Sequence, residues 1–228
     1  MILFLWYLPL WLLALLLWVL LRRRAYRVSP WFFAYVAFGV VADVARFVTH
    51  NRPRPYFATY WISEAGYCLL GVLAMYEVIR SVLGNLPRAW WSHLLFPATL
   101  LAGIGLSVAR THAALSPPTG ILLWIVAGEI AVRFVQVFIF ASLASLAPLI
   151  GLRWPRYPFG VAMGFGLYAT IMLLSTSRFA DTGIRYLLMW SVTSLAAYSV
   201  AVLIWIWFFW APVNVADPEP QIPNPALR

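Results

Sequence analysis

Apolar residues fill seven long stretches of the chain, and short polar segments separate them. The stretches lie near residues 2–21, 31–49, 57–83, 91–109, 120–147, 158–176 and 186–210. Each comes close to the roughly 20 residues that a helix needs to cross about 30 Å of hydrocarbon. Proline, glycine or charged residues bound every stretch, as at the ends of membrane spans. The pattern predicts an all-α, polytopic membrane protein with a seven-transmembrane-helix bundle in residues 1–210.

Composition supports this class. Hydrophobic residues make up 64% of the chain and charged residues 10%, whereas about a quarter of the residues in soluble domains are charged. The first stretch has no positive residue ahead of it and no small-residue cleavage site behind it. It is therefore predicted to be the first span rather than a signal peptide.

The arginines predict the orientation of the bundle. All 16 basic residues are arginines. Nine lie in the loops after spans one, three and five and in the C-terminal tail, five lie on the opposite side, and Arg46 and Arg133 lie inside spans. Because positive residues favour the cytoplasmic side, we expect the N-terminus outside and the C-terminus in the cytoplasm, in a bacterial inner membrane. The scattered arginines do not favour binding to nucleic acid, and a chain without lysine excludes a retinal Schiff base.

The tail, residues 211–228, contains five prolines and is predicted to be disordered. A segment of this length cannot hold a folded effector domain. Apart from the lipid bilayer, the expected partner of a signalling protein of this kind is therefore a separate signalling or envelope protein. The oligomeric state is left open. The single cysteine, Cys68, excludes an internal disulfide and multi-cysteine metal sites.

Ionisable residues inside spans are the default candidates for function, because burying a charge in hydrocarbon is costly. In span five, Glu129, Arg133 and Gln136 lie on one helical face, with Glu129 roughly 15 Å deep. Polar seams also occur in spans two, three and seven. If these seams converge, they line one polar interior open to the outer side, and the predicted ligand-binding residues are Glu129, Arg133, Gln136, Glu64, Asp43, Arg46, Tyr60 and Tyr67.

Other polar residues complete this hypothesis. Span three adds Cys68 and Gly71 to its seam, and span seven contributes a thinner seam. The residues of span seven are Ser191, Ser194 and Tyr198. The mouth of the pocket is predicted to be surrounded by His50, Arg52, Arg54, Arg110, His112, Arg178, Asp181 and Arg185.

A structural alternative is that the acids and arginines only neutralise each other within helices. Four pairs have the spacing of intrahelical salt bridges. They are Glu129 with Arg133, Asp43 with Arg46, Glu77 with Arg80, and Asp181 with Arg185. Such pairs would allow the helices to insert and pack without any ligand.

A faint internal repeat suggests another function. The spacing Arg24-x-x-Arg27 recurs as Arg153-x-x-Arg156, and residues 73–78 resemble residues 195–200. Both matches place spans one to three over spans five to seven, a three-plus-one-plus-three arrangement found in some small transporters. We therefore expect a sensory or small-ligand-binding protein, with a small-solute transporter or a non-catalytic subunit of an envelope complex as alternatives.

Enzymatic chemistry finds little support. Arg52-Pro53-Arg54-Pro55, Pro118-Thr119-Gly120 and Ser177-Arg178 resemble, in order, fragments of the three motifs of the lipid phosphate phosphatase superfamily. The histidine acid and the histidine nucleophile of that family are replaced by Ile121 and Ile184. Without a nucleophile no phosphatase activity is expected. The three histidines lack metal-binding spacing, so neither a metal nor a cofactor is predicted.

Overall fold

The computed structural model describes residues 2–83, 90–112, 121–149, 155–179 and 187–211. In these ranges the chain forms seven α-helices and one short 3-10 helix, with no strand. In chain order they are α1 (Ile2–Arg22), η1 (Ala25–Arg27), α2 (Pro30–Thr49), α3 (Pro53–Leu83), α4 (Trp90–His112), α5 (Ile121–Leu149), α6 (Arg156–Phe179) and α7 (Leu187–Trp210). The predicted all-helical class is confirmed. Asp181, Arg185 and the tail beyond Ala211 lie outside the described residues.

Five helices are long and apolar enough to cross a membrane. Their candidate spans are Pro30–Thr49, Pro53–Val82, Ala127–Ser145, Arg156–Ser175 and Ser191–Trp210. The corresponding segments of α1 and α4, Leu8–Arg22 and Pro97–Ala109, are shorter within the described residues. Large apolar side chains also point outward, including Trp11, Ile62 and Trp207, which are 68–70% exposed. Since so much exposed apolar surface needs an apolar surrounding, the fold supports a membrane protein.

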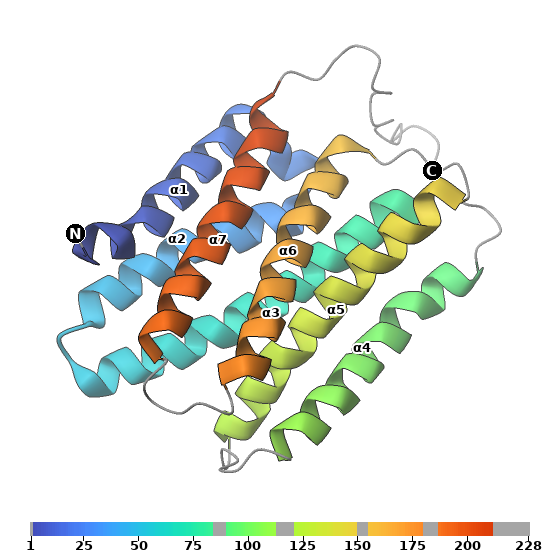
Figure 1. The fold of residues 1–228 in the computed structure, drawn as a ribbon. Helices are drawn as coiled ribbons and strands as arrows, with labels where there is room; N and C mark the ends of the chain where they lie inside the picture. Colours follow the sequence, from blue (N-terminus) through green and yellow to red (C-terminus); the bar gives the residue numbers. More distant parts are fainter. Residues whose placement is uncertain (1, 84–89, 113–120, 150–154, 180–186, 212–228) are drawn as a thin grey trace.

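Six of the helices form a closed ring. Neighbours around it are α1 and α2, α2 and α3, α3 and α5, α5 and α6, α6 and α7, and finally α7 and α1. The seventh helix, α4, packs mainly on α5 and lies at the edge of the bundle (Figure 1). The ring therefore consists of two sets of three consecutive helices, and α4 connects them from outside.

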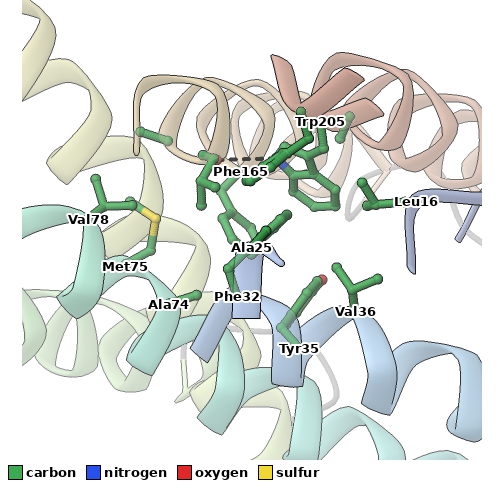
Figure 2. Packing of buried hydrophobic residues seen from close by; sticks show 14 of the residues in the cluster. Leu16, Ala25, Phe32, Tyr35, Val36, Ala74, Met75, Val78, Phe165 and Trp205 are labelled. Atoms are coloured by element: carbon green, nitrogen blue, oxygen red, sulfur yellow. Dashed lines mark hydrogen bonds between the residues drawn. The ribbon is translucent and has the colours of Figure 1, made fainter. Parts of the chain in front are cut away.

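Aromatic rings fill the half of the bundle near the start of α2 and the end of α7. Phe32 stacks on Phe209 with ring centroids 5.5 Å apart, and it meets Trp205 edge-on at 5.2 Å. Tyr35 of α2 meets Phe165 of α6 at 4.9 Å. Figure 2 shows Phe32, Phe165 and Trp205 pointing toward one another between the helices. This cluster closes the centre of the ring in that half with apolar surface.

Glycines of α6 make room for this packing. A Cβ added at Gly164 would overlap Trp205, and one at Gly160 would lie 2.5 Å from Phe208. Both aromatic residues belong to α7, so the Gly160-x-x-x-Gly164 motif receives aromatic side chains of a neighbouring helix in the same chain. The packing of α6 on α7 thus depends on the absence of side chains at these two positions.

The start of α2 is capped from another helix. The backbone N–H groups of Trp31 and Phe32 donate to Glu77 Oε2 of α3, each at 3.2 Å. Ser29, at the N-cap position of α2, makes no side-chain capping bond. The predicted pairing of Glu77 with Arg80 is therefore wrong, because the carboxylate instead accepts N–H groups left unpaired in the first turn of α2.

Candidate functional site

An ion pair joins α2 to α3. Arg46 Nη2 lies 2.8 Å from Glu64 Oε1, with side chains 21% and 16% exposed. Arg46 Nε also donates to Ser63 Oγ at 2.7 Å, and the Ser63 hydroxyl donates to the Tyr60 carbonyl at 2.8 Å. The guanidinium is therefore held by a carboxylate and a hydroxyl that α3 presents side by side.

Aromatic rings complete the surroundings of this arginine. The Arg46 guanidinium carbon lies 4.8 Å from the Tyr60 ring centroid and 5.6 Å from that of Tyr67. A cation over the face of an aromatic ring is electrostatically favourable. The Tyr67 hydroxyl in turn donates to the Gly39 carbonyl of α2 at 3.4 Å. Four residues of one α3 seam thus serve to fix Arg46 and α2.

The predicted salt bridge between Asp43 and Arg46 is not formed. Their spacing on one helix allows the contact, but the arginine turns to Glu64 on the neighbouring helix. Glu64 is the better partner because Ser63 beside it supplies a second acceptor for the planar guanidinium. Asp43 interacts with Arg46 only at longer range, and within the described residues its carboxylate has no salt-bridge partner.

The second ion pair lies within α5. Arg133 Nη2 donates to Glu129 Oε1 one turn earlier, as the sequence predicts. The Arg133 guanidinium lies 5.3 Å from the ring centroid of Tyr168 on α6. That ring meets Tyr198 of α7 at 5.6 Å. The arginine therefore connects α5 to α6, and the tyrosine pair continues the contact to α7.

The two ion pairs belong to one polar region. Glu64 interacts electrostatically with Glu129 and Arg133 across the α3–α5 interface, and Cys68 interacts with the same three charges. Asp43 interacts with Tyr67 and Tyr198. We call this region the polar layer. Its members are Asp43, Arg46, Tyr60, Ser63, Glu64, Tyr67, Cys68, Glu129, Arg133, Tyr168 and Tyr198.

Of the eight predicted site residues, seven belong to the polar layer. The eighth, Gln136, is 5% exposed and lies toward the aromatic cluster. A Cβ added at Gly71 would lie 3.3 Å from its Nε2 atom and 3.9 Å from Tyr35. Gln136 therefore lies between α3 and α5, at the side of the polar layer that faces the aromatic cluster.

The layer occupies the half of the bundle that contains the α2–α3 turn. Arg46 precedes the end of α2 by one turn, and Glu64 lies about 16 Å along α3 from its start. The residues on α5, α6 and α7 lie at similar distances from the same end of the bundle. The aromatic cluster occupies the other half. One end of the ring interior is thus polar and the other is closed by apolar rings.

Sequence reasoning missed two members of the layer. Ser63 stands next to Glu64 and one turn after Tyr60, and its place as the small polar residue of that seam could have indicated it. Tyr168 lies one turn after Gly164 in α6, and nothing local distinguishes it from an interfacial tyrosine. Only its position beneath Arg133 shows its role.

The predicted mouth of the pocket is described only in part. His50 Nδ1 donates to the Phe47 carbonyl at 2.7 Å, as an interfacial histidine does. Arg52 and Arg54 are exposed at the start of α3. The side chains of Arg110, His112, Arg178, Asp181 and Arg185 lie outside the described residues. No group of three metal-ligating side chains occurs in the described part of the chain.

A separate small recess lies at the opposite end of the bundle. It is lined by Ser29, Phe32, Ala74, Glu77, Val78, Ser81, Pro158 and Val161. Its interior has room for little more than one water molecule. The recess lies beside the capping contact of Glu77 and is too small for an organic ligand.

The layer contains two buried polar atoms without hydrogen-bond partners. Arg133 Nη1 and the Tyr198 hydroxyl are buried and have no well-formed hydrogen bond in the described part of the chain, although the side chains of Tyr35 and Tyr198 interact. Leaving such groups unpaired costs about 1–3 kcal/mol each, so they favour a visiting acceptor, either water or a ligand. No known protein family, characterised protein or solved structure matches this chain.

Proposed function

We propose that this chain is a membrane receptor that binds a small molecule in the polar layer and transmits binding to a separate partner protein. The observation that carries the proposal is the pair of buried unpaired groups, Arg133 Nη1 and the Tyr198 hydroxyl. Most buried donors in folded proteins are paired, so a network that only neutralised charges for insertion would seldom leave two of them unpaired in one place. A ligand that accepts their hydrogen bonds would gain affinity from contacts that the unliganded protein lacks.

The proposal includes seven spans, with the α2–α3 turn on the outer face of a bacterial inner membrane. Five helices satisfy the length and hydropathy of a span, and α1 and α4 add shorter apolar segments. The arginine distribution favours the cytoplasm for the other end of the bundle. The polar layer then faces the outside, and the aromatic cluster separates it from the cytoplasm.

Cys68 provides the direct test because it is the single cysteine of the chain and interacts with Glu64, Glu129 and Arg133. The protein is reconstituted in vesicles and treated with a membrane-impermeant maleimide from either side. We expect labelling from the side of the α2–α3 turn, and none in the Cys68→Ser control. If Cys68 reacts only after unfolding in detergent, the layer is sealed from water and the salt bridges are merely structural.

A second candidate function is transport of a small solute. The ring consists of α1–α3 and α5–α7, and exchanging the two sets preserves the order of neighbours around it. Tyr35 and Phe165, on the middle helices of the two sets, meet at the centre of the ring. Two similar halves around a central site are what alternating access requires.

Residues that correspond in the sequence repeat are not always equally buried. Val78 of α3 is 3% exposed, whereas its counterpart in the repeat, Val200 of α7, is 44% exposed. The helix order thus supports two halves better than the residue correspondence does. Vesicle uptake separates the candidates: a transporter accumulates solute with time, whereas a receptor binds it to a saturating stoichiometry.

A further inference from the structure

Three polar groups of the layer have no hydrogen-bond or salt-bridge partner among the described residues. Two of them are donors and one is an acceptor. The donors are Arg133 Nη1 and the Tyr198 hydroxyl. The acceptor is the carboxylate of Asp43, because Arg46 pairs with Glu64 instead. A ligand that satisfied all three would need a donor at one end and an acceptor at the other.

The tyrosine pair Tyr198 and Tyr168 connects these groups. Asp43 interacts electrostatically with Tyr198, and the Tyr198 ring contacts Tyr168 at a centroid distance of 5.6 Å. Arg133 lies over the other ring of this pair at 5.3 Å. The tyrosine pair therefore lies between Asp43 on α2 and Arg133 on α5. Because the tyrosine rings pack closely, the ligand must be small.

The charge balance of the layer selects the kind of ligand. Its described acids, Asp43, Glu64 and Glu129, exceed its arginines, Arg46 and Arg133, by one. The two ion pairs account for four of these charges, which leaves Asp43 as the excess negative charge. In an apolar surrounding a monovalent cation at Asp43 restores neutrality, whereas an added anion deepens the excess.

Resting on the proposed function, we infer that the polar layer binds a small primary amine that also carries a neutral hydrogen-bond acceptor. The ammonium group pairs with Asp43, and an amide or hydroxyl oxygen accepts from Arg133 Nη1 and Tyr198. Such a ligand satisfies all three unpaired groups and neutralises the layer. A simple amine leaves Arg133 unpaired, and an amino acid adds a carboxylate beside Glu129.

Four small probes test this inference. Alaninamide carries the amine and the acceptor, isopropylamine only the amine, propionamide only the acceptor, and alanine an amine with a carboxylate. Each is added at millimolar concentration, and the rate of Cys68 labelling by the maleimide is measured in vesicles. We expect alaninamide to slow the labelling several-fold and the other three probes to have little effect.

Variants assign the contacts. Asp43→Asn and Arg133→Lys should each raise the alaninamide concentration needed for half-maximal protection of Cys68 about 10- to 100-fold. Each variant loses a hydrogen bond to a charged group. Arg133→Lys retains the positive charge beside Glu129 and therefore disturbs the fold less than a neutral substitution would. Tyr198→Phe should raise the half-maximal alaninamide concentration about fivefold. The matched control is Ser199→Ala, whose hydroxyl already donates to the Leu195 carbonyl at 2.8 Å.

The inference is overturned if isopropylamine or propionamide protects Cys68 as well as alaninamide does, because one of the contacts is then unnecessary. It is likewise overturned if alanine protects equally well, because the acceptor then need not be neutral. It is also overturned if no probe protects a cysteine that the maleimide reaches; the layer then holds water or another ligand class, and the proposed binding function stands. A cysteine that never reacts from water contradicts the proposed function itself.

Discussion

Arg46 shows how a residue buried in a membrane bundle selects its partner. Three contacts from α3 surround it: the Glu64 carboxylate, the Ser63 hydroxyl and the tyrosine rings. Asp43, on its own helix, offers a carboxylate alone. The interhelical set prevails because a planar guanidinium gains most from several acceptors in its plane.

The partner choice has a measurable consequence. Glu64→Gln should lower the free energy of unfolding by about 1–2 kcal/mol, because it leaves the Arg46 guanidinium without its anion. Asp43→Asn should cost clearly less, since no salt bridge is lost. Thermal unfolding of the detergent-solubilised protein measures both. Equal losses for the two variants would mean that Arg46 depends on Asp43 as much as on Glu64.

Glu77 makes a second prediction at this scale. Glu77→Ala should lower the free energy of unfolding by about 1–2 kcal/mol, because two N–H groups at the start of α2 lose their acceptor. Arg80→Ala, at an exposed position one turn away, should have little effect. The same unfolding measurement compares them. If Arg80→Ala matches Glu77→Ala, the two residues act as a salt bridge and the capping contact is unimportant.

At the scale of elements, α6 and α7 depend on glycines that receive aromatic side chains. Gly164→Ala should lower the free energy of unfolding by about 1–3 kcal/mol, because the new methyl group overlaps Trp205 and disturbs the aromatic cluster. Gly128→Ala on α5 is the matched control. A Cβ at Gly128 meets nothing within 4 Å, and alanine favours a helix over glycine by about 0.5–1 kcal/mol.

The outcome that would contradict this packing is equal behaviour of the two glycine variants. Unfolding curves in detergent suffice for the comparison, and a change in tryptophan fluorescence for Gly164→Ala alone would place the disturbance at Trp205. Gly160→Ala, opposite Phe208, should behave like Gly164→Ala. The three substitutions together separate the packing effect from the helix propensity of alanine.

Helices themselves were predictable from the sequence, because each apolar stretch encodes its own element. The start of α3 was placed too late, near residue 57, whereas the helix begins at Pro53. Proline is well suited to the first turn of a helix, so Pro53 and Pro55 start α3 rather than delay it. The place of α4 outside the ring has no local signal, since its apolar character resembles that of the ring helices.

At the scale of the whole molecule, the arginine distribution predicts an orientation that a reporter can test. A fluorescent protein that folds only in the cytoplasm should be active when fused to the C-terminus, and alkaline phosphatase fused at the same place should be inactive. The reverse pattern would place the polar layer on the cytoplasmic side. The maleimide would then reach Cys68 from the other face of the vesicle.

Two features of the sequence determined most of what is predictable about this chain. The spacing of apolar stretches determined its helices and its membrane class, because hydrocarbon imposes a length and an internally bonded backbone on every span. The rarity of charges inside spans indicated the candidate residues, because a buried charge is retained only with a partner or a role. Seven of the eight candidate residues accordingly lie in the polar layer.

The tertiary structure alone decided how those residues are paired. Spacing on one helix predicts the pairs Asp43 with Arg46 and Glu77 with Arg80, but it contains no information about the neighbouring helix. Once α2 packs on α3, Arg46 reaches Glu64 and Glu77 reaches the start of α2, and both contacts replace the local ones. The unpaired atoms of Arg133 and Tyr198 follow from the same packing, because burial and hydrogen bonding are set by whichever helices surround a side chain.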